Sequence, residues 1–224
     1  MNFFSNVSSK FLTTSNSVLL LLVIFTIFLI PFFPIELHKY FYSICYTLIF
    51  LLSALALSKY RSRIFNIAVL VVLMEWLSEL LDFPILNKIS FAVNISFFGL
   101  IVVLFIQQIA RAKTVTPLVI MESINGYLML GMSFSILIAL ISFVDPNSFS
   151  FPHLSTGTDP TISYFSNYTY YGFVTLTTLG YGDVVPLTPA AKSFSIFTAI
   201  TGQMYIAIII AALIAKYLNQ SNSK

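Results

Sequence analysis

Charged residues are scarce in this 224-residue chain: Asp, Glu, Lys and Arg make up 8% of it, whereas 58% is hydrophobic. Soluble domains carry about 25% charged residues, so this composition excludes an ordinary water-facing surface. The single cysteine, Cys45, cannot form an internal disulfide. A net charge of +3, carried by scattered basic residues, argues against nucleic acid as a partner. An aromatic content of 16% excludes disorder, and what remains is an integral membrane protein.

Long apolar runs follow one another along the chain. A helix crosses the hydrocarbon core of a bilayer with about 20 mostly apolar residues. By this measure the sequence predicts six transmembrane helices, over residues 18–33, 40–57, 64–81, 89–109, 117–144 and 190–218. A polar stretch and a short helical run over residues 164–177, too short to cross, separate the last two. The predicted fold is therefore an all-α membrane protein with a re-entrant helix between helices five and six.

Basic residues are distributed unevenly between the predicted helix ends. If the N-terminus lies inside, then all of the 11 basic residues except Lys39, Lys88 and Lys192 lie on the same side as both termini. An excess of Lys and Arg marks the cytoplasmic side of a membrane protein. The pattern predicts a multi-pass protein of the cell membrane with both termini cytoplasmic, and it places residues 146–189 on the outer face.

Two closely spaced glycines stand out in the outer stretch, which reads Thr175-Leu176-Thr177-Thr178-Leu179-Gly180-Tyr181-Gly182-Asp183. A dehydrated potassium ion needs oxygen ligands, and a narrow ring of backbone carbonyls supplies them. Successive carbonyls point the same way only if the backbone alternates between right- and left-handed conformations. Gly180 and Gly182 tolerate the left-handed one. The Thr178 hydroxyl can add an inner ring of ligands, and Tyr181 can pack outward.

Residues 177–183 resemble the selectivity-filter signature of the potassium-channel superfamily, whose usual core is Thr-Val-Gly-Tyr-Gly followed by Asp. Leu179 stands at the usual Val position, and its side chain is expected to face away from the pore. The resemblance covers residues 116–218 and implies a passive ion channel, not an enzyme, with no cofactor and K+ as the permeant ion. It implies that the ion-binding filter consists of Thr178, Leu179, Gly180, Tyr181 and Gly182, with K+ held at the first four.

The residues that flank the filter extend the resemblance. Tyr170 and Tyr171 stand where many family members carry paired aromatics on the pore helix, and with Thr177 and Asp183 they are expected to support the filter. We hypothesise that Tyr170 donates a hydrogen bond to Asp183. The chain contains one complete filter motif, whereas a closed ring needs four strands. The resemblance therefore implies a homotetramer with the pore on its fourfold axis.

The last predicted helix has a polar position within an apolar face. Gln203 shares that face with Ile206, Ile210 and Ile214, and the resemblance implies that these four line the cavity. A helix–helix hydrogen bond is the alternative role for Gln203. The resemblance places a gating hinge at Gly202, although glycine also serves close packing in membrane helices. Both roles remain open from the sequence.

Six helices with a pore between the last two resemble the plan of voltage-gated channels. The predicted division is a cytoplasmic N-terminus (1–16), a four-helix sensor-like domain (17–110), an interfacial linker (111–116), a pore domain (117–218) and a cytoplasmic tail (219–224). A voltage sensor needs several arginines along its fourth helix. Residues 89–113 are charged only at Arg111 and Lys113, which can meet lipid headgroups, so steep voltage gating is not expected.

Glu75, Glu79 and Asp82 share one face of the third helix, in the outer half of the predicted membrane. This face is either a modulatory site for protons or divalent cations, or, as we favour, a hydrated or ion-paired surface. Because Leu179 replaces the usual Val, a weakly selective cation channel of the same fold is an alternative function. A transport subunit or a non-conducting partner subunit is the third possibility. The sequence does not identify the gating stimulus.

Overall fold

The computed structural model describes residues 2–57, 61–81, 84–151 and 165–222. The chain forms two compact units, of which the first comprises residues 1–26 and 40–126 and the second residues 27–39 and 127–224. Within the described ranges the secondary structure is helical, apart from one isolated antiparallel bridge between Phe149 and Pro186. The expected all-helical fold is therefore present.

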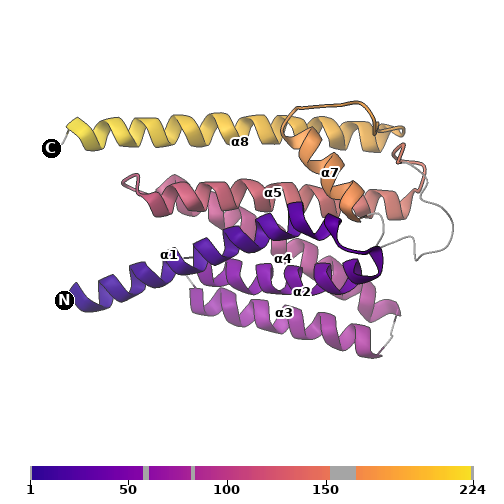
Figure 1. Cartoon of the computed structure of the whole chain (residues 1–224), viewed down its shortest axis with the longest axis horizontal. Coiled ribbons are helices and arrows are strands. Elements are labelled where there is room, and N and C mark those ends of the chain that lie inside the picture. The colour runs from indigo at the N-terminus through magenta and orange to yellow at the C-terminus, as the bar shows by residue number, and fades with distance from the viewer. Residues whose placement is uncertain (1, 58–60, 82–83, 152–164, 223–224) are drawn as a thin grey trace. The chain divides into compact units, whose positions relative to one another are not determined.

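The helices can be followed along the chain in Figure 1. The first half contains α1 (Asn2–Ile24), continued by the π-helical η1 (Phe25–Leu29) and the 3-10 helix η2 (Ile30–Phe32), then α2 (Ile35–Ala56), α3 (Arg61–Leu81) and α4 (Pro84–Arg111). The second half contains α5 (Pro117–Val144), α7 (Phe165–Leu176) and α8 (Pro189–Asn222).

Five helical segments of the described chain are long and apolar enough to cross a membrane. They lie in α1 with its continuation, α2, α4, α5 and α8. The 21-residue helix α3 is not among them, so the count of six spans stays a prediction.

The beginnings of α5 and α8 follow one local rule, a threonine followed by a proline. Pro117 and Pro189 occupy the first helical position, where the missing N–H is not needed and the fixed φ suits a helix. The preceding threonines cap both helices. The Thr116 hydroxyl accepts from the Val119 amide at 3.3 Å, and the Thr188 hydroxyl accepts from the Ala191 amide at the same distance.

The first unit has a buried apolar face on α4 and an aromatic contact between α4 and α2. Ile101, Phe105 and Ile109 recur every fourth residue on one face of α4 and are almost completely buried. The Phe50 ring of α2 packs on Phe97 of α4 with 4.8 Å between ring centroids. This packing holds the unit together through apolar side chains rather than through charges.

Two buried asparagines join three helices of the same unit. Asn16 of α1 donates to the Ala56 carbonyl of α2 at 3.4 Å, and Asn125 of α5 donates to the Asn16 carbonyl at 3.0 Å. Neither asparagine exposes any surface. Because an amide in an apolar interior must find a partner, these bonds fix the relative positions of the three helices.

A buried carboxyl group links α4 to α5. Glu122 is 3% exposed, and its Oε1 accepts a hydrogen bond from Gln108 Nε2 at 2.7 Å. Taking a carboxyl group out of water is costly unless donors replace the water. Gln108 therefore makes the burial of Glu122 tolerable.

Replacing Gln108 tests this link. We expect Gln108→Met to leave Glu122 buried without its donor and to destabilise the protein by about 1–3 kcal/mol. Gln107→Met is the matched control, because the neighbouring Gln107 is exposed. Thermal unfolding in detergent would measure both variants. Equal midpoints for the two would show that the hydrogen bond does not stabilise the fold.

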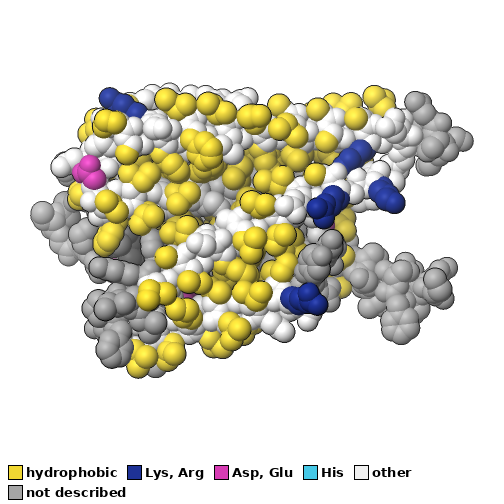
Figure 2. Space-filling model, turned by 180° about the vertical axis from the view of Figure 1, so that it is seen from behind, with side chains coloured by type: hydrophobic (Ala, Val, Ile, Leu, Met, Phe, Trp, Pro, Cys, Tyr) yellow, Lys and Arg dark blue, Asp and Glu magenta, His cyan; other side chains and the backbone are white. Residues whose placement is uncertain are grey.

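Large hydrophobic side chains are exposed over the whole length of the chain. On α8 they include Phe197, Ile200 and Ile208, each more than half exposed. Figure 2 shows hydrophobic side chains over most of one face of the molecule. A surface this apolar requires a covering of lipid or of other protein.

Candidate ion-conducting site

The site is built around α7, a 12-residue helix too short to cross a membrane. In the second unit α7 packs closely on the 127–144 part of α5. A Cβ atom added at Gly172 would lie 2.6 Å from Ser135 Oγ, and one added at Gly131 would overlap the Phe173 ring. Glycine at these two positions therefore allows the helices to approach each other.

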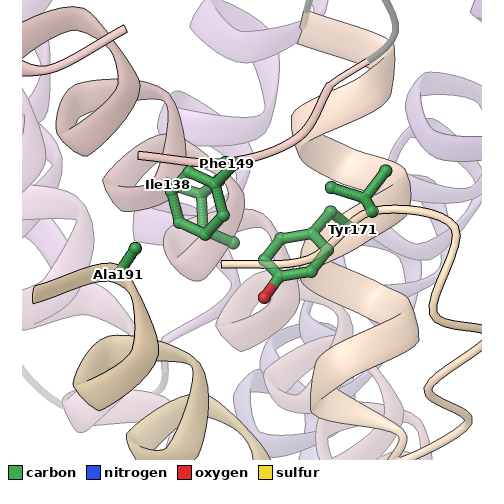
Figure 3. Close-up of a cluster of buried hydrophobic side chains, with 5 residues drawn as sticks. Ile138, Phe149, Tyr171 and Ala191 are labelled. Carbon is green, nitrogen blue, oxygen red and sulfur yellow. The ribbon is translucent and has the colours of Figure 1, made fainter. Parts of the chain in front are cut away.

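Tyr171 anchors α7 in the core of this unit. Its ring packs edge-on against Phe149 with 5.1 Å between centroids, and its hydroxyl lies 2.7 Å from Ser195 Oγ of α8. Figure 3 shows the cluster, which includes Ile138, Ala191 and Val184. Since Val184 follows the loop directly, the same core holds α7 and the exit of the loop.

The C-terminus of α7 determines how the loop begins. The Leu179 amide donates to the Val174 carbonyl, and the Thr178 amide donates to the Thr175 carbonyl, each at 3.0 Å. This pair of bonds is the Schellman motif, whose first residue beyond the helix end has a left-handed conformation and is usually glycine. Here that residue is Thr178, with φ +59°. A β-branched residue in this conformation costs about 1–3 kcal/mol, which points to a function for its side chain.

The left-handed conformation recurs at every second residue of the loop. Thr178, Gly180 and Gly182 have φ values of +59°, +58° and +79°, and no other residue in the described ranges has a positive φ. The sequence predicts this alternation at the two glycines. The residue type gives no sign of it at Thr178, and the signal that was missed is the two-residue spacing back from Gly180.

Amides and carbonyls are used differently in the loop. The amides of residues 177–180 donate to the last carbonyls of α7. In contrast, none of the carbonyl oxygens of residues 178–182 accepts a hydrogen bond from the described part of the chain. The loop therefore has five consecutive backbone oxygens available for other ligands.

Tyr170 and Asp183 join α7 to the far end of the loop. The Tyr170 hydroxyl donates to Asp183 Oδ2 at 2.6 Å, the contact that the sequence predicts. This hydrogen bond lowers the pKa of Asp183 below its ordinary value of 3.8, because it stabilises the carboxylate. It also raises the pKa of Tyr170 to about 12, because the ionised phenol would face a carboxylate.

Gly202 and Gln203 of α8 meet the near end of the loop. A Cβ atom at Gly202 would overlap the Leu176 carbonyl oxygen and lie 2.9 Å from the carbonyl carbon. Close packing therefore has a direct structural basis at Gly202, and the hinge stays a prediction. The next residue, Gln203, donates from Nε2 to Thr178 Oγ1 at 2.8 Å. Gln203 therefore forms its hydrogen bond with the loop and not with a neighbouring helix.

The other predicted site residues are placed less closely. Ile206, Ile210 and Ile214 are exposed on α8, and their role in lining a cavity stays a prediction. Glu75 is exposed on α3. The Glu79 side chain and all of Asp82 lie outside the described residues. The modulatory acidic face therefore stays a prediction as well.

Comparison with known proteins points to the same region. Residues 148–219 match the model of a family described as "Ion channel". A stretch of 50 residues is 42% identical to the "Two pore potassium channel c" of Oryza sativa subsp. japonica, and it covers 22% of this chain and 11% of the rice protein. No solved structure matches the chain. Part of the chain is therefore similar to ion channels, one of them a potassium channel, and the apolar helices indicate a multi-pass membrane protein.

Removing the Tyr170 hydroxyl tests the far end of the loop. We expect Tyr170→Phe to lower K+ flux into liposomes several-fold, because Asp183 loses the donor that fixes it. The contribution of this hydrogen bond to the stability of the folded loop is complete above pH 3.8. It is lost as the pH falls through the lower pKa of folded Asp183. Acid inactivation should therefore begin at a higher pH in Tyr170→Phe. Unchanged flux with an unchanged acid profile would contradict this role, and Tyr217→Phe, which changes an exposed tyrosine of α8, is the control.

Substituting Gly202 separates packing from hinge bending. We expect Gly202→Ala to push α8 away from α7 and lower stability by about 1–3 kcal/mol. Gly99→Ala is the matched control, because a Cβ there meets nothing within 4 Å, and it should be neutral or stabilising. Thermal unfolding in detergent measures both. If Gly202→Ala unfolds at the wild-type temperature but alters the opening of the channel, the main role of Gly202 is that of a hinge.

Proposed function

We propose that this chain is the subunit of a homotetrameric, potassium-selective channel that conducts K+ passively through a pore lined by residues 178–182. The observation that carries the proposal is the alternation of positive φ at Thr178, Gly180 and Gly182 beside five available carbonyl oxygens. Within this strand Thr178 adopts a conformation that is costly for a β-branched residue. The alternation is what a row of ion-coordinating carbonyls requires.

The chemistry follows from the number of strands. One chain supplies one strand, and a single strand surrounds an ion on one side only. Four strands about a common axis form stacked rings of oxygens from Thr178, Leu179, Gly180 and Tyr181, which replace the hydration shell of K+. The Thr178 hydroxyls form a further ring at the inner end. No cofactor is needed for this passive process.

Exposed apolar side chains favour assembly of several copies. Leu179 and Tyr181 are 56% and 68% exposed in the single chain. Both belong to the strand that lines the proposed pore. Neighbouring subunits would cover them and hold the strands at a fixed radius. Leu179, larger than the Val of the usual signature, supports one alternative, a weakly selective cation channel of the same fold.

The proposed arrangement in the membrane has six spans, with both termini cytoplasmic and the loop on the outer face. Between Lys88 and Arg111, α4 carries no basic residue, so we propose a channel without steep voltage dependence. Arg111 and Lys113, at the junction of α4 and α5, would meet lipid headgroups.

Ion flux into liposomes tests the proposal. We expect the purified protein to pass K+ at least about tenfold faster than Na+, to be blocked by Ba2+, and to respond weakly to voltage. Gly180→Ala should abolish the flux, because alanine is strained at φ +58° even though its Cβ would have room.

The contrary outcomes are distinct. Equal K+ and Na+ flux would favour the weakly selective channel. Flux coupled stoichiometrically to another solute would indicate a transporter, and no flux from folded protein would indicate a non-conducting partner subunit. A steep conductance–voltage relation would refute the proposed absence of voltage gating.

A further inference from the structure

Thr178 uses its hydroxyl differently from other threonines in the chain. Thr26, Thr169, Thr177 and Thr198 each donate to the backbone carbonyl four residues earlier, at 2.7 to 3.0 Å. This local bond is the ordinary arrangement for threonine in a helix. Thr178 Oγ1 instead accepts a hydrogen bond from Gln203, which lies 25 residues further along the chain. The Thr178 side chain is therefore held by α8 and not by its own helix.

We propose that Gln203 is a positioning residue for the innermost ion site, where it orients the Thr178 hydroxyl toward the permeant cation. The inference rests on the proposed function, because it assigns a role within the same pore. It goes beyond a role of Gln203 in lining the cavity. The cation affinity of the innermost site would depend on this glutamine of α8.

The hydrogen-bonding capacity of a hydroxyl explains how this works. Threonine has one O–H donor and two acceptor lone pairs. The Gln203 amide occupies one lone pair and fixes the position of Oγ1, which leaves the other lone pair for a cation. Without Gln203, the hydroxyl is free to turn and donate to a nearby carbonyl, as Thr177 does to Phe173 at 2.7 Å. The innermost site would then lose part of its oxygen ligands.

The reach of Gln203 depends on Gly202. Because Gly202 lacks a Cβ, the α8 backbone lies directly against the Leu176 carbonyl at the end of α7. Thr178 follows two residues after Leu176, and Gln203 follows Gly202 immediately, so the two side chains meet. Both residues are exposed in the single chain. Burial therefore does not force the bond, and four copies would carry it around the inner end of the filter.

Barium binding measures the site without requiring conduction. Ba2+ is a doubly charged cation close to K+ in size, and its affinity for purified full-length protein can be measured by calorimetry. We expect Gln203→Met, which keeps the side-chain length but removes the N–H donors, to weaken Ba2+ binding about tenfold, because the Thr178 hydroxyls lose the contact that orients them toward the cation. Gln107→Met on α4 is the matched control and should bind Ba2+ like the wild type.

A double-mutant cycle tests the route of the effect. Thr178→Val removes the hydroxyl but keeps the branched shape, so adding Gln203→Met to it should weaken Ba2+ binding no further. Thr178→Ser keeps the hydroxyl, so Gln203→Met should retain its effect in that background. Thr178→Gly, which also lacks the hydroxyl and suits φ +59°, takes the place of the valine variant if that variant does not fold.

Several results would overturn the inference. Unchanged Ba2+ affinity in Gln203→Met would do so, as would an equal loss with Thr and Val at position 178, because Gln203 would then act on the cation directly. Failure of the proposed function is distinguishable. Protein that shows the expected cycle but passes no K+ refutes conduction alone, and protein that conducts without the cycle refutes the role of Gln203 alone. Absence of Ba2+ binding to the wild type refutes the role of Gln203, and K+ flux into liposomes then decides the proposed function separately.

Discussion

The closure of α7 onto its own loop is the interaction on which the rest of the site depends. The Val174 carbonyl accepts from the amides of Leu179 and Gly180, and the Thr175 carbonyl accepts from Thr178. These bonds use the loop's amides and require a left-handed residue at Thr178. The amides are thus bonded to the helix, whereas the carbonyls of residues 178–182 accept no hydrogen bond from the described residues. In the proposed channel, this helix terminus would therefore determine which backbone atoms a cation reaches.

The remaining contacts hold this strand at its two ends. Gln203 holds Thr178 at the near end, where α8 approaches α7 closely because residue 202 is glycine. Tyr170 holds Asp183 at the far end, and Val184 enters the core cluster around Tyr171. No hydrogen bond from the described residues restrains the carbonyls in between. In the proposed channel, a strand fixed at both ends would be preorganised, so an entering ion would not have to order the chain.

Local signals made much of this predictable. Residues 117–144 were predicted as a helix with the bounds that the structure has, because Thr-Pro begins α5 and Asp-Pro follows it. The first helix was predicted over 18–33 but extends from Asn2 to Phe32, since polar residues such as Asn16 conceal its start. Asn16 is buried against Asn125, 109 positions away, a pairing that only the tertiary fold creates. Similarly, glycine marks the positive φ at Gly180 and Gly182, whereas nothing in the residue type marks it at Thr178.

The most direct test is to locate the ion. A structure of the protein determined in Tl+, a heavy substitute for K+, would show the cation by its scattering. We predict four copies about a fourfold axis, with a row of Tl+ peaks between the carbonyl rings of Thr178, Leu179, Gly180 and Tyr181. An assembly without fourfold symmetry, or Tl+ bound away from these carbonyls, would contradict the account.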